Sequence, residues 1–475
     1  MMEKDSTTRL MLFNTESREI ESIVARDHLI RMYTCGPTIY DFAHIGNFRT
    51  YVFEDLLRRT LEFFGYKVVQ AMNITDVDDK TIRGAIAKKG SLLEFTEPFR
   101  QAFFEDLQTL SIEKAEYYPA ATDYIPEMIR VIERLIEKGC AYVSPNGSIY
   151  FKIKSFPTYG RLSHLRQEDL LPNASGDNDA DEYDKENISD FVLWKVFDPA
   201  RDGLICWDSP FGKGRPGWHI ECSAMAMKLL GETIDIHCGG VDNMFPHHEN
   251  EIAQSESFSG QRFVRHWVHV EHLIVDHKKM SKSLNNFYTL RDLLKRGYSG
   301  PQVRYLLLST HYRSQLNFSL QGLDAAKASL GRLEDLILRL KSIQSNRSEE
   351  SVSGLLLKAD TDFKSALAAD LNISAALAVL FDLVRELNTL SDANVLSKKD
   401  ASEALALLEK WNKVLAVLPF QPEEQIPEDL TALLRQREQA RKEKNYALSD
   451  QLRREIDARG YCLEDTPTGV RLKKK

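Results

Sequence analysis

A chain of 475 residues exceeds the roughly 100–200 residues of one ordinary domain, so about three domains are expected. With 43% apolar residues, 28% charged residues and a mean hydropathy of −0.35, the composition excludes disordered and membrane-embedded proteins. The net charge of −8 argues against a protein that coats nucleic acid nonspecifically, but it permits a local basic surface.

The start of the chain lacks the basic flank, apolar run and small-residue cleavage site of an export signal, and no stretch of about 18 apolar residues follows. We therefore expect a cytoplasmic protein that does not contact a membrane. The cysteines are too sparse and irregular for a secreted disulfide framework, so reduced thiols are expected. They are Cys35, Cys140, Cys206, Cys222, Cys238 and Cys462.

The first pattern along the chain predicts a βαβ unit. Residues 28–34 (HLIRMYT) predict a strand, CGPTIYDFAHIGN predicts a loop, and the following helix-period residues end near Gly65, where KVVQAMNIT predicts a second strand. This order implies parallel strands with a ligand site at their carboxyl ends.

A second α/β block follows an insertion. Residues 94–138 predict helices, short β-prone runs extend from Ala141 to Trp194, and the acidic stretch Glu168–Asp190 predicts a surface loop with no assigned chemistry. The segments IDIHCGG and HWVHVEHLIV then predict strands around a helix that begins at Pro246. Two βα blocks on either side of an insertion predict one split Rossmann-type nucleotide-binding domain.

From about Gln302 the pattern is almost wholly helical and predicts a bundle. After the proline-containing segment VLPFQPEEQIPEDL comes a last helical region, in which residues 435–475 hold twelve Lys/Arg against seven Asp/Glu, interleaved with Tyr446 and Tyr461. Such a region suits RNA phosphates and unpaired bases, although a solvated, salt-bridged helix is the alternative.

The tetrapeptide HIGN, formed by His44, Ile45, Gly46 and Asn47, lies in the loop that opens the first predicted helix. Free backbone N–H groups and the helix dipole favour phosphate oxygens there, and Gly46 lets a ligand approach the backbone. The alternative is a helix-capping turn with an incidental histidine.

The run KMSKS at residues 279–283 follows a predicted strand and concentrates positive charge on a small polar loop. When a carboxylate attacks the α-phosphate of ATP, the leaving pyrophosphate gains negative charge that a positioned ammonium stabilises. Lys282 is the first candidate for that role, with Lys279 beside it. A solvated surface loop is the alternative.

A metal site is indicated by Cys222, His247 and Glu251, together with Cys35 beside the first loop. Positions 247 and 251 share a helix face, so both side chains can reach one ion. Two thiolates, an imidazole and a carboxylate suit zinc. Periodicity alone leaves the neighbouring His248 and Glu249 as rival ligands.

A HIGN loop near the start and KMSKS after an insertion resemble the two signatures of class I aminoacyl-tRNA synthetases. The chain is similar to the cysteinyl branch of that family over essentially its whole length. The resemblance lies in MYTCGPTIYDFAHIGN, NITDVDDK, GRPGWHIECSAM, GGVDNMFPHHENEIAQSE, KKMSKSLNNF and the ending GYCLEDTPTGVRLKKK.

The resemblance implies activation of L-cysteine by ATP with Mg²⁺, followed by transfer of cysteine to tRNA(Cys). The resemblance favours one Zn²⁺ per chain, bound by Cys35, Cys222, His247 and Glu251. Zinc would let the enzyme discriminate cysteine, bound as its thiolate, from serine, because apolar contacts distinguish such isosteres poorly. Thr75 and Trp218 lie in motifs that resemble the amino-acid pocket, and Asp242 in GGVD is a candidate for binding an ATP ribose or the substrate ammonium. A structural role is the alternative for each of the three. The remaining implied site residues, for catalysis and ATP binding, are His44, Gly46, Asn47, Lys279 and Lys282.

The expected architecture is an α/β catalytic domain with a connective insert, followed by a helical bundle and an anticodon-binding region. Its expected parts are residues 1–120 and 206–300 for the two catalytic halves, 121–205 for the insert, 301–418 for the bundle and 419–475 for the C-terminal region. A monomer is expected. Departures from the family pattern are Asn47 in place of histidine, Cys238 in place of glycine, the ADLNIS segment and Leu472.

Two rival functions remain open at this point. One is a cysteine ligase that transfers the same adenylate to a small amine, against which the helical, basic C-terminal region argues. The other is a zinc-bearing RNA-binding protein without catalysis, in which both ATP loops are relics.

Overall fold

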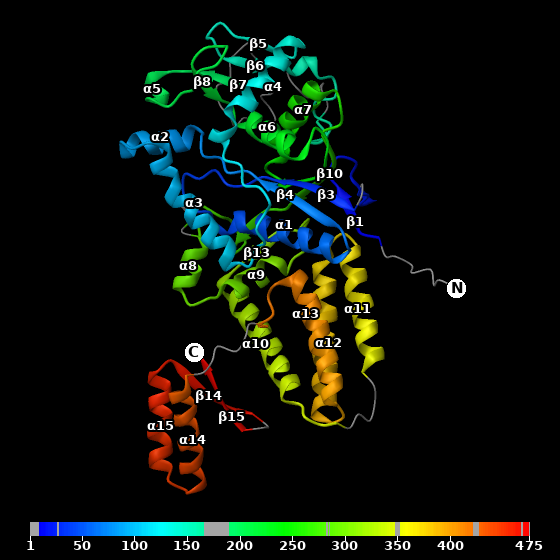
Figure 1. Ribbon diagram of the computed structural model, residues 1–475, viewed down its shortest axis with the longest axis vertical. Helices are drawn as coiled ribbons and strands as arrows, with labels where there is room; N and C mark the ends of the chain where they lie inside the picture. Colours follow the sequence, from blue (N-terminus) through cyan, green and yellow to red (C-terminus); the bar gives the residue numbers. More distant parts are fainter. Residues whose placement is uncertain are drawn as a thin grey trace, which may run out of the picture.

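A four-stranded parallel sheet in the order β10-β9-β3-β4 forms the centre of the computed structural model (Figure 1). The structure describes residues 9–25, 28–165, 190–281, 284, 286–346, 352–420, 427–466 and 469–474. Each block supplies two neighbouring strands, because β3 of the first pairs in parallel with β9 of the second. The expected split nucleotide-binding fold is therefore confirmed. The strands are β3 (Leu29–Thr34), β4 (Lys67–Met72), β9 (Ile234–Gly240) and β10 (Val264–Val270).

Helices cover both faces of this sheet (Figure 1). One face packs on α1 (Ile45–Phe63), whose Phe53 and Leu57 share a buried cluster with Met32 and Cys238. Side chains of successive strand residues point to opposite faces of the sheet, so the His237 side chain points away from α1 and the Cys238 side chain points toward it. The other face packs on α4 (Ile125–Glu137), α6 (Trp218–Leu230) and α7 (Glu249–Ser259).

The insertion carries its own antiparallel sheet in the order β5-β6-β7-β8. Its last strand, β8, comes after residue 205, the expected end of the insert, and still completes this sheet through pairing of Trp194 with Pro216. The strands are β5 (Ala141–Val143), β6 (Ile149–Phe151), β7 (Phe191–Val196) and β8 (Gly214–Pro216). Between β4 and this sheet the chain forms α2 (Asp79–Lys88) and α3 (Leu92–Thr109), and α5 (Pro199–Asp202) follows β7. The acidic stretch Glu168–Asp190 lies outside the described residues except for Asp190.

The run HWVHVEHLIV, expected as one strand, is two strands in two sheets. β10 stays in the central sheet. After it, the Glu271 N–H donates to the Tyr312 carbonyl at 2.8 Å, so the chain no longer pairs with β9 at this point. β11 (Leu273–Val275) then pairs with β12 (Lys278–Lys279) and with β13 (Leu316–Phe318), which interrupts the expected helical region. The helix expected at Pro246 becomes a regular α-helix only at Glu249. It is preceded by the short π-helical segment Met244–His248, in which Phe245 before the proline is extended, with φ −137° and ψ 132°.

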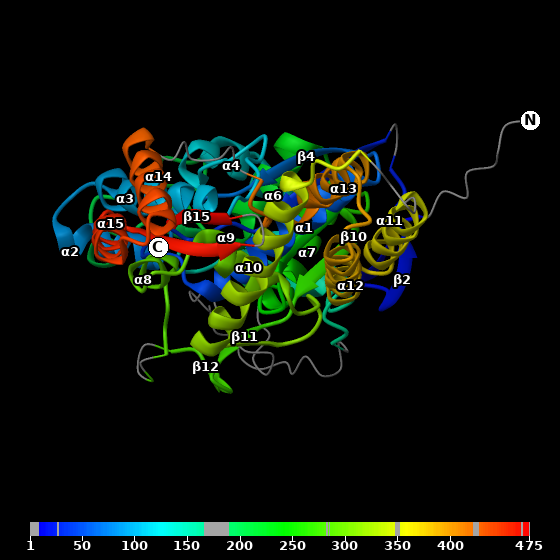
Figure 2. The ribbon, with the colours of Figure 1, turned by 90° about the horizontal axis from the view of Figure 1, so that it is seen from below.

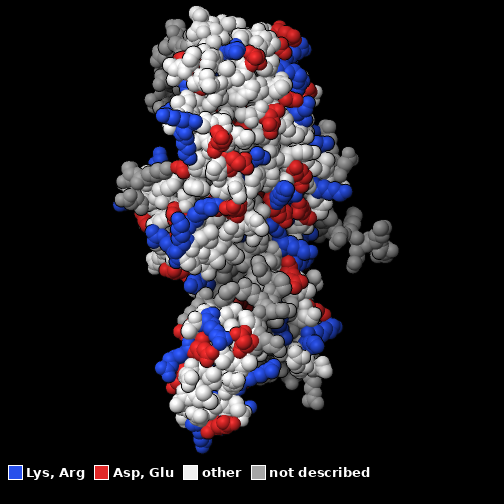
Figure 3. All heavy atoms as spheres, turned by 60° about the vertical axis from the view of Figure 1, so that its left-hand side comes forward, with Lys and Arg blue, Asp and Glu red and all other residues white. Residues whose placement is uncertain are grey.

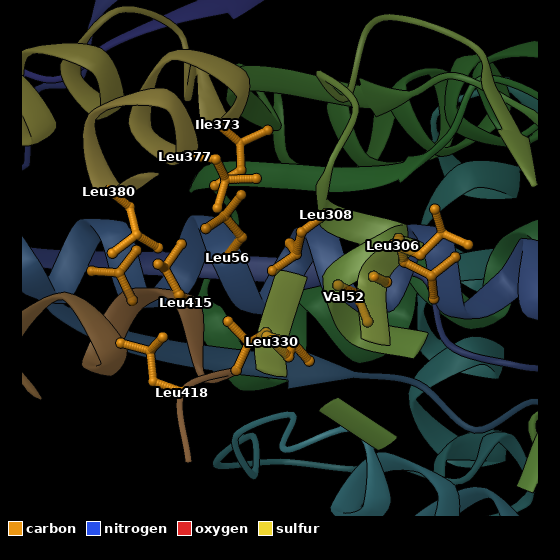
Figure 4. Close-up of a cluster of buried hydrophobic side chains, with 14 of the residues drawn as sticks. Val52, Leu56, Leu306, Leu308, Leu330, Ile373, Leu377, Leu380, Leu415 and Leu418 are labelled. Carbon is orange, nitrogen blue, oxygen red and sulfur yellow. The ribbon is translucent and has the colours of Figure 1, made fainter. Parts of the chain in front are cut away.

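The bundle is continuous with the catalytic core. Val52 and Leu56 of α1 belong to the same buried cluster as Leu330, Leu380 and Leu415 of the bundle (Figure 4). Four helices form the bundle, which Figure 2 shows nearly end-on: α10 (Leu320–Ser342), α11 (Ser353–Ala368), α12 (Ile373–Asp392) and α13 (Lys398–Leu415). α8 (Leu290–Lys295) and α9 (Gly300–Leu308) connect the two parts.

The C-terminal unit has a separate small core around Leu430 and Ile456. It contains α14 (Glu428–Lys442), α15 (Tyr446–Ala458) and an unpredicted hairpin of β14 (Tyr461–Thr466) and β15 (Gly469–Lys474). A second unpredicted hairpin, β1 (Met11–Asn14) with β2 (Glu19–Ser22), lies near the start. In the described part of the chain, no helix has the length and apolar character needed to cross a bilayer.

Candidate active site

Four buried side chains meet at the carboxyl ends of the central strands. Cys35 directly follows β3, Cys222 lies on α6, His247 lies in the short helical segment Met244–His248 before α7, and Glu251 lies on α7. One ligand atom from each lies within 4.8 Å of the ligand atoms of the other three. Segments far apart in the chain therefore bring together the four residues that the resemblance favours.

His248 also borders this cluster, because a second group in the described residues combines Cys35, His237, His248 and Glu251. Nε2 of His248 lies 3.2 Å from the sulfur of Cys35, and Nε2 of His237 lies 3.1 Å from Oε2 of Glu251. Nδ1 of His248 in turn lies 2.8 Å from Nε2 of His269. The histidines thus surround the cluster, and His248 remains geometrically able to contact an ion there.

Glu249, the other rival ligand, points elsewhere. Its carboxylate accepts hydrogen bonds from the backbone N–H groups of Gly160 at 2.8 Å, Leu162 at 3.1 Å and Ser163 at 2.9 Å. These bonds hold the segment that leaves the inserted sheet against α7. Glu249 therefore has a structural role, which helical periodicity did not reveal.

The cluster is strongly polarised. Burial alone would raise the pKa of Glu251, but His237 and His247 outweigh it and lower this pKa to about 2. Burial lowers the pKa of His247, but Cys222 and Glu251 outweigh it and raise this pKa to about 10. The pKa of Cys222 is lowered, first because Cys35 donates to its sulfur, and the pKa of Cys35 rises correspondingly.

This donor set fits a metal ion. The charged forms of the Glu251 carboxylate and the Cys222 thiolate are stabilised by protons on neighbouring side chains, and a divalent cation can take the place of those protons. Sulfur and imidazole donors in one buried cluster suit zinc better than magnesium or calcium, which prefer oxygen.

Two of the three expected pocket residues border the cluster. The Trp218 ring stacks on the His247 ring, with centroids 4.2 Å apart. The buried Thr75 hydroxyl donates to Oε2 of Glu221 at 3.2 Å and accepts from Asn73 at 3.1 Å. Glu221 precedes Cys222 in the chain and was missed by the sequence analysis, although HIEC offered a polar signal.

Asp242 lies apart from Thr75 and Trp218, in the exposed turn after β9. A Cβ on Gly240 would lie 2.2 Å from Oδ1 of Asp242 and 3.9 Å from the Thr50 hydroxyl of α1. Asp242 therefore lies near Thr50 of α1, and it belongs to neither group of possible metal ligands among the described residues. Cys238 also faces α1, where burial and the nearby Glu54 raise its pKa, and it is absent from both clusters of possible metal ligands among the described residues.

The HIGN residues form the first turn of α1. His44 is the N-cap: its Nδ1 accepts from the Asn47 N–H at 3.2 Å, and the Asn47 side chain accepts from the His44 N–H at 3.1 Å. The amide of Asn47 thus closes a reciprocal cap, which gives the departure from histidine a structural role. A Cβ on Gly46 would lie 2.9 Å from the His44 ring and 3.2 Å from Cε of Met280, so glycine permits this packing.

The two signatures are in direct contact. Besides the Met280 packing, the Ile45 N–H donates to the Tyr288 carbonyl at 3.0 Å, and the His44 ring meets the Phe287 ring edge-on at 5.3 Å. Lys279 ends the exposed strand β12. Lys282, the first candidate for stabilising pyrophosphate, lies outside the described residues.

Comparisons with known proteins match three consecutive regions of the chain. Residues 21–328 match the family described as tRNA synthetases class I (C) catalytic domain, residues 362–419 match the DALR domain, and residues 423–471 match the cysteinyl-tRNA ligase anticodon binding domain. The cysteine–tRNA ligase of Protochlamydia amoebophila is 60% identical over 98% of both chains. That of Chlamydia trachomatis (serovar A) is 55% identical over 98% of this chain and 99% of the relative.

The chain belongs to the cysteinyl-tRNA synthetase family. Among solved structures, a Mycobacterium tuberculosis methionyl-tRNA synthetase in complex with methionyl-adenylate aligns with a TM-score of 0.59 at 13% identity, covering 82% of this chain and 90% of that one. The LeuRS of Agrobacterium radiobacter K84, in a ternary complex with tRNA, aligns with the same TM-score at 12% identity, covering 83% and 87%. These two likenesses establish the class I fold that the cysteinyl-tRNA synthetase family shares.

Proposed function

We propose that this chain is an ATP-dependent ligase that activates L-cysteine as cysteinyl-adenylate and then transfers cysteine to the 3′-terminal ribose of tRNA(Cys). The observation that carries the proposal is the buried Cys/His/Glu cluster at the carboxyl ends of the central strands, in a chain of this family. No residue has to act as a nucleophile, since the carboxylate of cysteine and the ribose hydroxyl are the attacking groups. Positioning and charge stabilisation then account for the rate.

The cluster of Cys35, Cys222, His247 and Glu251 would hold one zinc ion per chain. Zinc would supply a soft partner for the thiolate of cysteine, which the harder hydroxyl of serine matches poorly. The protein itself orients this partner: His237 holds the Glu251 carboxylate and Trp218 stacks on His247. These contacts fix the ligand side chains before substrate arrives.

Binding of ATP with Mg²⁺ falls to the two signatures, with His44, Gly46, Asn47, Lys279 and Lys282 as the proposed residues. The N–H groups of His44, Ile45 and Asn47 already donate within the protein, so the α1 N-terminus would attract phosphate oxygens through the positive end of the helix dipole. The lysines would offer positive charge to the departing pyrophosphate. Met280 of the KMSKS run packs directly on Gly46 of the HIGN tetrapeptide, and this contact supports a phosphate site formed by the two signatures together.

Thr75, Trp218 and Asp242 are proposed substrate contacts. The hydrogen bond of Thr75 with Glu221 and the stacking of Trp218 on His247 support a cysteine pocket beside the metal cluster. The exposed carboxylate of Asp242 is available to a ribose hydroxyl or an ammonium.

Recognition of tRNA is assigned to the C-terminal region from residue 419, supported by the match of residues 423–471 to an anticodon binding domain. The division into catalytic halves 1–120 and 206–300, insert 121–205 and bundle 301–418 remains part of the proposal. A cytoplasmic, monomeric enzyme completes it.

The deciding experiment is cysteine-dependent exchange of pyrophosphate into ATP by the purified full chain, before and after zinc removal, with serine as the competing substrate. The expected result is exchange with cysteine alone, lost with the zinc and restored by adding it back. A second assay charges tRNA and separates this ligase from one that acylates a small amine. Absence of exchange in zinc-loaded protein would overturn the proposal.

A further inference from the structure

Two exposed aromatic side chains stand on the rim of the active site. Tyr40 is 40% exposed and Phe42 is 41% exposed, and both lie in the loop that connects Cys35 of the metal cluster to His44 of the ATP signature. We name Tyr40, Phe42 and the cations beside them, Lys80 and Arg291, the aromatic rim.

The backbone of this loop is fixed by its neighbours. The Ile39 N–H donates to the Thr75 carbonyl at 3.0 Å, and the Thr75 N–H donates to the Pro37 carbonyl at 3.0 Å. Ile39 is buried in the large core and Ala43 packs against it, so the residues between them, Tyr40 and Phe42, are turned outward. The aromatic rings are thus presented on a rigid support, and the core does not require them.

Each ring carries a cation. Nζ of Lys80 lies 5.2 Å from the centre of the Tyr40 ring, and the guanidinium of Arg291 lies 5.4 Å from the centre of the Phe42 ring. The Phe42 ring also meets the Phe99 ring edge-on at 5.4 Å, which fixes its orientation while leaving much of it in water. Aromatic rings for stacking beside cations for phosphates are the two components of single-stranded nucleic-acid sites.

The surroundings favour a local contact rather than a broad basic surface. Figure 3 brings the α2 and α3 side forward and shows blue basic and red acidic side chains interspersed. The whole chain has a net charge of −8, so RNA gains little from its average field. Stacking at specific rings is therefore the contact that this face can offer.

We propose that the aromatic rim binds the unpaired 3′ end of the RNA substrate, with bases stacked on Tyr40 and Phe42 and a phosphate near Lys80. Arg291 orients the Phe42 ring, and its charge is balanced by Glu105 at 2.7 Å and Asp106 at 3.4 Å. This inference rests on the proposed function and names the surface that its second step uses. Along the chain, Tyr40 lies five residues after Cys35 and Phe42 lies two residues before His44, so an RNA end held by the rim is brought next to both sites. It takes no part in adenylate formation, which proceeds without RNA.

The test compares the full-length variants Tyr40→Ala and Phe42→Ala in both half-reactions. Pyrophosphate exchange should stay within about twofold of the parent protein, while kcat/KM for tRNA charging should fall about 5- to 100-fold, the loss expected for one base stack. Tyr40→Phe keeps the ring and should restore charging. Leu204→Ala, which removes an apolar side chain that is 96% exposed on the insert, is the matched control and should change neither reaction.

A binding measurement identifies the part of the RNA involved. Phe42→Ala should weaken binding of intact tRNA but leave unchanged the binding of tRNA that lacks its unpaired 3′ end. Equal weakening of both RNAs, unchanged charging, or a parallel fall in exchange would each overturn the proposal. Failure of the parent protein to catalyse exchange would instead count against the proposed function, whatever the variants do.

Discussion

Replacing Glu249 by glutamine separates a structural carboxylate from a metal ligand. Its Oε1 accepts from Gly160, and its Oε2 accepts from the Leu162 N–H and from both the N–H and hydroxyl of Ser163. A glutamine carbonyl can keep the three bonds at Oε2, but its NH₂ group then faces the Gly160 N–H, and two donors repel each other.

The size of the effect follows from these contacts. One buried N–H without an acceptor costs about 1–3 kcal/mol, and three charge-assisted bonds become weaker neutral ones. Burial raises the pKa of Glu249, so removing the charge returns part of that loss. We expect the free energy of unfolding to fall by about 2 kcal/mol, with zinc content unchanged.

The assay is urea unfolding followed by circular dichroism, with and without a chelator, together with zinc analysis of the folded protein. Glu249→Gln should lose the same stability in both conditions, because its contacts do not involve the metal. Glu251→Gln is the matched comparison: it should lower zinc content, and its stability loss should shrink when chelator is present. If Glu249→Gln released zinc while leaving stability in chelator unchanged, the structural assignment of this carboxylate would be refuted.

Three further outcomes are expected. Cys222→Ser should lower zinc affinity at least tenfold, measured by competition with a chromogenic chelator, and an unchanged affinity would remove Cys222 from the ligand set. The Asn286 side chain donates to the Lys279 carbonyl at 3.1 Å, and Asn286→Asp removes that donor. This substitution should slow pyrophosphate exchange about tenfold with a small change in KM for cysteine. An exchange rate equal to the parent's would show that this hydrogen bond does not support the reaction. Burial, only partly offset by Arg291, raises the pKa of Asp106 to about 6, so the native state holds this proton more tightly than the unfolded chain does. Asp106 should therefore contribute a fall of about 1–2 kcal/mol in the free energy of unfolding as pH rises from about 4 to about 6. Asp106→Asn should remove that contribution, and equal pH dependence of the two proteins in thermal melts would contradict it.

The sequence determined those features that depend on neighbouring residues. The spacing of apolar residues predicted the strands and helices of both α/β blocks, since periods of 2 and 3.6 follow from backbone geometry alone. The HIGN tetrapeptide predicted a helix start, and His44 and Asn47 form the reciprocal cap within three residues. The ordered signatures also predicted the family, because each is short, local and readable without a fold.

Tertiary structure decided which distant residues come into contact, and which residues close in sequence contact different parts of the molecule. The parallel register of β3 with β9 brings Cys35 to the cluster on α6 and α7. Glu249 and Glu251 are two residues apart and therefore lie on nearly opposite faces of α7. The position of the inserted segment decides which of them meets backbone N–H groups, and the other carboxylate joins the cluster.

The same limit explains the errors in the fold. The run from β10 to β11 contains no glycine, proline or other turn-forming residue. Its division between two sheets therefore depends on pairing with Tyr312 and β13, which lie later in the chain. The contact between the bundle and α1 is likewise absent from the linear pattern, because their side chains meet in one buried cluster only in the folded chain. Periodicity specifies which face of an element is buried, whereas the partner that buries it is chosen by contacts between segments that the linear pattern does not contain.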